Sequence, residues 1–197
     1  MRVPLRYLIV IFITGWLSLA QAASDPTLQV KVKRIAGKVI IDINMLVAVP
    51  PPLAFEVMTD YNRMPSFLSN ISSSKITKKE GDKLIVAQQG KASSGPISFA
   101  FETVREITLT VPSDIHSKII GGSIKQGESH THLRAEEAST RLIIHSETSA
   151  PPIMPPLLGV AFVESQTRKQ YGLLRDEMLK RQRALIKPPG ETNNSHN

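Results

Sequence analysis

The sequence predicts an α+β fold: a curved antiparallel sheet of about seven strands wrapped on a long C-terminal helix, with a short helix after the first long strand. Apolar and polar residues alternate in successive segments between Leu28 and Thr148, which is the pattern of strands with one buried face. Short turns join these segments, so neighbouring strands are antiparallel. A single long segment with helical spacing begins at Val160.

The first 22 residues have the composition of an export signal. Arg2 and Arg6 flank the start, Tyr7 to Leu19 is almost wholly apolar, and Ala20-Gln21-Ala22 fits the small-residue cleavage rule. An uncleaved membrane anchor is the alternative, but the apolar run is shorter than the roughly 20 residues of a spanning helix. We expect cleavage near Ala22 and a periplasmic or secreted protein.

Composition excludes several classes of site. The chain has no cysteine, and therefore no disulfide, thiolate metal site or cysteine nucleophile. Its 24 Lys and Arg residues outnumber 17 Asp and Glu residues, but the basic residues are interleaved with acidic ones and lack aromatic neighbours. This pattern indicates a solvated surface, so we expect no nucleic-acid partner, while transient contact with an anionic membrane surface stays open.

The first two strands are followed by the short helix. Leu28 to Ile35 and Val39 to Val49 alternate in period two around the turn Ala36-Gly37. Pro50 to Pro52 stop the second strand. A proline in the first helical turn lacks only an N–H that would be unpaired there, so these residues can begin a helix over Leu53 to Met58.

The remaining strands alternate with turn signals. Ile71 to Ile76 and Lys83 to Gln89 flank a polar turn, and Gly90 to Pro96 is interpreted as a flexible loop. A strand restarts at Ile97 and runs to Val111, where Pro112 breaks it. The last three strands are expected at residues 115–120, 123–135 and 140–148.

A rigid proline-rich connection over residues 149–156 leads to the amphipathic last helix. Its apolar stripe contains Val160, Val163, Thr167, Tyr171, Leu174 and Met178. The helix has roughly 25 residues and a length of about 37 Å, and Pro188 ends it. We expect one domain over residues 23–187 and a disordered tail over residues 188–197.

The predicted elements leave a hollow interior. An antiparallel sheet of this size curls, and only the last helix is long enough to cover its concave face. With few aromatic side chains in the chain, that covering does not fill the space. An apolar cavity of this kind suits a hydrophobic small molecule.

The segment from Val47 to Leu68 carries a resemblance to a known family. Val47 to Pro52, Phe55 to Tyr61 and Arg63 to Leu68 resemble START-like proteins of the polyketide cyclase/dehydrase and lipid-transport superfamily (SRPBCC), most of all the branch named for coenzyme Q-binding START domains. The resemblance spans about residues 28–183. It implies the helix-grip fold and a cavity for lipids, isoprenoid quinones, polyketides or sterol-like molecules, and only some members are enzymes.

The resemblance marks Asp60, Tyr61 and Pro65 as a family motif. The residues themselves favour structural roles: Asp60 ends a helix by bonding nearby backbone, and Tyr61 wedges its loop against the sheet. Ligand contacts are expected from the loop at the cavity mouth, one strand face and the last helix. The candidates are Met64, Phe67, Leu68, Phe99, Phe101, Val163, Tyr171 and Leu174.

No catalytic residue, metal site or cofactor is predicted. The chain has no G-x-S-x-G elbow, no Rossmann or P-loop glycine pattern and no H-E-x-x-H. His130 and His132 share a strand face that His145 could approach, which would suit zinc. Arg134 and Glu136 on the same face indicate a solvated surface instead.

Arg105 is the one charged residue that continues the apolar alternation of Phe99 and Phe101. An inward arginine would have to bind an anionic ligand group or pair with an acid, because burying its charge is costly. We expect instead that the strand bulges or ends near Val104 and leaves Arg105 exposed.

These observations favour a non-enzymatic exported protein that binds a hydrophobic small molecule or lipid. The alternative is a cyclase or aromatase-type enzyme acting on a hydrophobic substrate in the same cavity. A third hypothesis, an interaction module that uses its basic last helix, predicts a filled core. An inward cluster of carboxylate, histidine or arginine would favour catalysis, and an apolar lining would favour binding.

Overall fold

The computed structural model describes residues 25–94, 97–149 and 159–186. The predicted signal over residues 1–22, most of the proline-rich connection and the tail over residues 188–197 lie outside these ranges. No helix among the described residues is long and apolar enough to cross a membrane.

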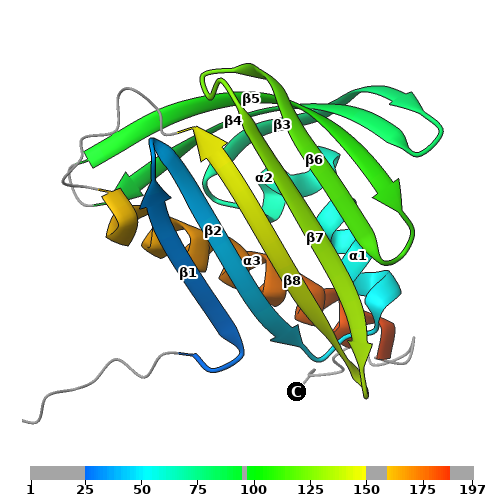
Figure 1. Ribbon diagram of the computed structural model, residues 1–197. Coiled ribbons are helices and arrows are strands. Elements are labelled where there is room, and N and C mark those ends of the chain that lie inside the picture. Colours follow the sequence, from blue (N-terminus) through cyan, green and yellow to red (C-terminus); the bar gives the residue numbers. More distant parts are fainter. Residues whose placement is uncertain (1–24, 95–96, 150–158, 187–197) are drawn as a thin grey trace, which may run out of the picture.

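A single antiparallel sheet forms most of the molecule. Its strands are β1 (Leu28–Ile35), β2 (Lys38–Val47), β3 (Ile71–Glu80), β4 (Lys83–Ser94), β5 (Ile97–Thr110), β6 (Asp114–Gly122), β7 (Gly127–Glu136) and β8 (Ser139–Ser149). The spatial order is β1-β2-β8-β7-β6-β5-β4-β3. The sheet curves around one long helix, as Figure 1 shows. The predicted fold class is confirmed, with eight strands where about seven were expected.

The helical elements lie on the concave side of the sheet (Figure 1). They are α1 (Pro51–Thr59), the 3₁₀ turn η1 (Tyr61–Arg63), α2 (Met64–Phe67) and α3 (Gly159–Ile186). Prolines occupy the first positions of α1, as the sequence predicts, because those positions need no N–H donor. The helix α3 has 28 residues and crosses the concave face.

The β4–β5 hairpin is longer than expected, because the segment predicted as a loop from Gly90 continues β4 to Ser94. Gly90 pairs with Phe101 of β5 in this extension. A side chain on Gly90 would place its Cβ 2.2 Å from the backbone oxygen of Asn70 and 2.5 Å from the Phe101 ring. Glycine is therefore present here for close packing inside a strand, not for loop flexibility.

The packed core lies at one end of the molecule, where the second half of α3 meets α1 and the sheet. Met178 has no exposed surface, and Leu174 is also buried. The opposite half of α3 buries only Phe162. The molecule therefore has a filled end and, beneath the first half of α3, a hollow one.

Arg181 of α3 binds three carboxylates, two of which, Glu56 and Asp60, join α3 to α1 and its C-terminal end. Its Nε donates to Glu177 Oε1 at 2.9 Å, its Nη1 to Glu56 Oε1 at 3.0 Å and its Nη2 to Asp60 Oδ2 at 2.7 Å. The guanidinium also lies over the Phe67 ring, 5.6 Å from its centroid. Burial acts to raise the pKa of Glu177, but hydrogen bonds from Arg181 and Lys180 outweigh it and hold that pKa below its usual range.

Arg181→Met should lower the free energy of unfolding at neutral pH by about 2 kcal/mol, because it leaves the buried Glu177 carboxylate without its main partner. Because the pKa of Glu177 is lower in the folded protein than in the unfolded chain, its ionised form stabilises the fold at a pH above the unfolded-state pKa. This stabilisation is lost as the pH falls through the folded-state pKa. The difference between variant and wild type should therefore shrink in acid.

Urea unfolding followed by circular dichroism measures both effects. The matched control is Arg183→Met, because Arg183 is exposed on the same helix and its loss should change stability by less than about 0.5 kcal/mol. Equal midpoints for Arg181→Met and the control would contradict the role assigned to Arg181.

Candidate functional site

A cavity of about 690 Å³ lies between the concave face of the sheet and α3. Ligand sites in proteins have volumes of roughly 300 to 1,000 Å³. The space stays open because small residues occupy inner positions of the central strands. Ser117 of β6 is paired with Ser129 of β7, which is paired with Ser146 of β8, and all three line the cavity.

Most of the lining is apolar and comes from both walls. The sheet contributes Ile41, Ile43, Phe99, Phe101, Ile115, Ile119 and Ile144, and α3 contributes Phe162, Val163 and Leu174. Phe99 and Phe162 meet edge to face across the cavity, with ring centroids 5.8 Å apart.

Seven of the eight predicted ligand contacts line this cavity: Met64, Leu68, Phe99, Phe101, Val163, Tyr171 and Leu174. Phe67 does not line it. Its ring packs beneath the Arg181 guanidinium, because α2 directs Met64 and Leu68 inward and Phe67 toward the second half of α3. Ligand contact by the seven lining residues stays a prediction.

The motif Asp60, Tyr61 and Pro65 divides between two roles. Asp60 ends α1 as expected, and its backbone N–H donates to the Val57 oxygen. Its carboxylate caps no helix and instead accepts from Arg181. Pro65 is exposed in the first turn of α2. Tyr61 is only 3 % exposed and lines the cavity, so this residue of the motif belongs to the site as well as to the core.

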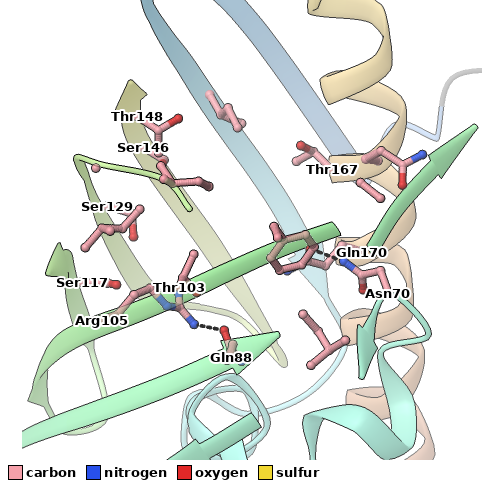
Figure 2. Close-up of a pocket in the computed structure, with 18 of the residues that line it drawn as sticks. Asn70, Gln88, Thr103, Arg105, Ser117, Ser129, Ser146, Thr148, Thr167 and Gln170 are labelled. Atoms are coloured by element: carbon pink, nitrogen blue, oxygen red, sulfur yellow. Dashed lines mark hydrogen bonds between the residues drawn. The ribbon is translucent and has the colours of Figure 1, made fainter. Parts of the chain in front are cut away.

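The expectation that Arg105 is exposed is wrong. An irregularity does occur at this point, but the extra residue, Ile120, is in β6, because Val104 pairs with Gly121 and Arg105 with Ile119. The alternation of β5 therefore continues without interruption. Arg105 lies on the inner face with Phe101 and projects into the cavity (Figure 2).

Neutral groups surround the Arg105 guanidinium. Its Nη2 donates to Gln88 Oε1, as Figure 2 shows, and its Cζ lies 5.9 Å from the centroid of the Tyr61 ring. Gln88 is itself held by hydrogen bonds from its Nε2 to Ser74 Oγ at 2.9 Å and to Met64 Sδ at 3.1 Å. The Nε of Arg105 is buried without a hydrogen-bond partner.

Gln88 is a residue of the site that was not predicted from the sequence. The signal was nevertheless present: Leu84, Val86 and Gln88 occupy alternate positions of β4, so Gln88 is a polar residue on an otherwise apolar face. A polar residue on a buried face needs a partner, and here its carbonyl oxygen accepts from Arg105.

Residues 47–170 match the family model described as polyketide cyclase/dehydrase and lipid transport. This match covers more than half of the chain. The chain belongs to this family. No curated protein sequence matches it.

Solved structures share the fold of this chain at low sequence identity. A STAR-related lipid transfer protein from Xanthomonas axonopodis is 11 % identical with a TM-score of 0.67, over 80 % of this chain and 97 % of that one. The Zhui aromatase/cyclase from Streptomyces sp. R1128 is 12 % identical with a TM-score of 0.63, over 77 % and 99 %. A START superfamily protein from Mycobacterium smegmatis is 10 % identical with a TM-score of 0.61, over 72 % and 97 %.

The histidines considered for zinc lie on the outer face of the sheet. Asp114 Oδ1 lies 3.1 Å from His130 Nε2 and 2.9 Å from His132 Nδ1, while His145 Nδ1 lies 2.7 Å from Asp42 Oδ1. The bond to Asp42 raises the pKa of His145. Within the described residues, no His, Cys, Asp and Glu side chains form a group able to hold a metal ion.

Two tyrosines of the cavity wall should titrate abnormally late. Burial raises the pKa of both Tyr61 and Tyr171 to about 12, against the opposing charge of Arg105. After removal of residues 1–22 these are the only tyrosines, and no tryptophan is left to mask them.

Absorbance at the phenolate band should therefore show no ionisation in the folded protein around pH 10, where both phenols ionise once the chain is unfolded in denaturant. A raised pKa stabilises the fold below the unfolded value, and this stabilisation is lost as the pH rises toward 12. A folded-state midpoint near 10 for either phenol would show that it is in contact with bulk water.

Proposed function

We propose that this protein is an exported carrier that binds one hydrophobic small molecule, such as a lipid, an isoprenoid quinone or a polyketide-like compound, between the sheet and α3. The observation that carries the proposal is the cavity of about 690 Å³ with a mainly apolar lining. Membership of a family described by polyketide chemistry and lipid transport supports it.

Burial of apolar surface supplies the driving force. Each Å² removed from water contributes about 25 cal/mol, so a ligand that buries roughly 400 Å² of apolar surface gains about 10 kcal/mol before ordering costs. Because the cavity is already open, the protein needs little rearrangement to accept the ligand.

The titratable groups of the cavity favour binding over the alternative of cyclase or aromatase catalysis. Among the described lining residues these are Arg105, Tyr61, Tyr171 and Glu128. The two phenols have a pKa of about 12 and are therefore protonated at neutral pH. The arginine side chain is not deprotonated in proteins. Glu128 is exposed and paired with His116 at 2.6 Å. Among the described residues that line the cavity, no inward side chain is therefore suited to accept a proton near neutral pH.

The proposed location rests on the signal-like segment over residues 1–22. An apolar molecule that crosses an aqueous compartment needs its surface covered, and a protein that encloses it meets that need. Transient contact with a membrane surface, where the ligand would be loaded or released, belongs to the same proposal.

Narrowing the cavity should weaken binding without unfolding the protein. The double variant Ser129→Leu/Ser146→Leu adds two apolar side chains at paired positions of the cavity floor. We expect the affinity for N-phenyl-1-naphthylamine, a neutral apolar fluorescent probe, to fall at least about tenfold, because a loss of about 1.4 kcal/mol of binding free energy corresponds to that factor.

Ser72→Leu is the matched control, since the same change is made at an exposed position of β3. This control should bind the probe like the wild type. Probe binding that is absent from the wild type, or unchanged in the double variant, would contradict the proposal.

A further inference from the structure

We propose that the Arg105 end of the cavity is a carboxylate subsite, so that the preferred ligand is an amphiphile with one carboxylate and a long apolar body. This inference rests on the proposed function of the cavity and names the chemical class of its ligand.

No acidic side chain contacts Arg105 among the described residues. Within residues 25–94, 97–149 and 159–186, its hydrogen-bond and ring contacts are the Gln88 amide and the Tyr61 ring, and its Nε has no partner. Arg105 is half-buried with its Nε fully covered, so the guanidinium loses part of its hydration without gaining an anion, which is unfavourable. A ligand anion that pairs with the guanidinium removes this unfavourable term. The side chain therefore destabilises the empty protein and favours binding of an anion.

Contacts within the protein hold the Arg105 guanidinium in place before any ligand binds. Gln88 is 6 % exposed, and its amide nitrogen is fixed by Ser74 and Met64, so its oxygen meets the Arg105 Nη2 from a defined direction. The Tyr61 ring supports the guanidinium from another element. A guanidinium has five N–H donors, so donors remain for the two oxygens of a carboxylate.

A carboxylate matches the charge of Arg105 better than a phosphate monoester or a neutral group does. Arg105 is the single cation among the described residues that line the cavity, and the carboxylate among them, Glu128, is exposed and paired with His116. Arg105 can therefore balance one negative charge of a ligand. A phosphate monoester carries nearly two charges at neutral pH and would keep one of them unbalanced. A neutral carbonyl or hydroxyl would leave the charge of Arg105 without compensation.

The surroundings of Arg105 also orient the ligand. Buried polar residues, Gln88, Ser117 and Thr103, lie at this end of the cavity, whereas the Phe99–Phe162 pair lies toward the first half of α3. Figure 2 shows Arg105 and Gln88 on the wall opposite Thr167 of α3. The carboxylate therefore lies at the sheet near β4 and β5, with the apolar body along the inner face beneath α3.

The test compares three amphiphiles with the same chain and different heads: dodecanoate, 1-dodecanol and dodecyl phosphate. Displacement of N-phenyl-1-naphthylamine from protein purified after expression of the whole chain gives each affinity at neutral pH. We expect dodecanoate to bind at least about tenfold more tightly than dodecanol and than dodecyl phosphate. Arg105→Met should reduce the carboxylate preference over dodecanol to less than about threefold, and the control Arg134→Met, an exposed arginine of β7, should keep it.

A second variant protects the test against misfolding of Arg105→Met. In Gln88→Glu, a glutamate of the same shape replaces the glutamine, and the oxygen that contacts Arg105 becomes part of a carboxylate. The protein then supplies the anion that pairs with Arg105. It should remain folded, still bind dodecanol, and lose the preference for dodecanoate.

The outcomes separate this inference from the proposed function. Binding of dodecanol and dodecanoate with equal affinity in the wild type, or stronger binding of dodecyl phosphate, overturns the carboxylate subsite and leaves the carrier function in place. Retention of the carboxylate preference in both Arg105→Met and Gln88→Glu also overturns the subsite. Failure of all three amphiphiles and of the probe to bind overturns the subsite and the carrier function together.

Discussion

The hollow interior depends on α3 being fixed at two points, one near its middle and one near its C-terminal end. Near its C-terminal end, Met178 is fully buried and Arg181 binds carboxylates of α1, of α3 itself and of the turn that follows α1. Near its middle, the Arg168 guanidinium donates to the backbone oxygens of Leu28 at 2.9 Å and Val30 at 3.2 Å on β1. Because the helix is rigid, these two attachments also fix the position of its first half, which lies over the open cavity.

This arrangement separates stability from function within one domain. The packed end, where α1 meets the second half of α3, supplies apolar burial, whereas the cavity forgoes packing contacts that a filled core would make. The unpartnered Nε of Arg105 adds a further cost in the empty protein. Local rules of protein structure are commonly violated at functional sites, and here the void and the uncompensated charge occur in the same place.

The sequence predicts the helices and strands well, but it predicts poorly which residues contact each other in the folded protein. Alternation locates the strands, prolines locate the start of α1, and an apolar stripe locates α3, because each signal is local. The role of Gly90 was missed, since only the pairing with Phe101 distinguishes a close-packed glycine from a loop glycine. Arg105 was misplaced because the bulge is in the neighbouring strand, and the Asp60–Arg181 pair joins residues 121 positions apart. Such contacts are set by the tertiary fold.

Native mass spectrometry of the protein isolated from its own cells tests the central claim most directly, because it shows what the cavity holds where the protein works. The account predicts one bound molecule of a few hundred daltons per chain, released on denaturation and recovered in organic solvent. A native mass equal to that of the polypeptide alone would contradict the account, because a carrier with an open apolar cavity of about 690 Å³ should retain its ligand through gentle isolation.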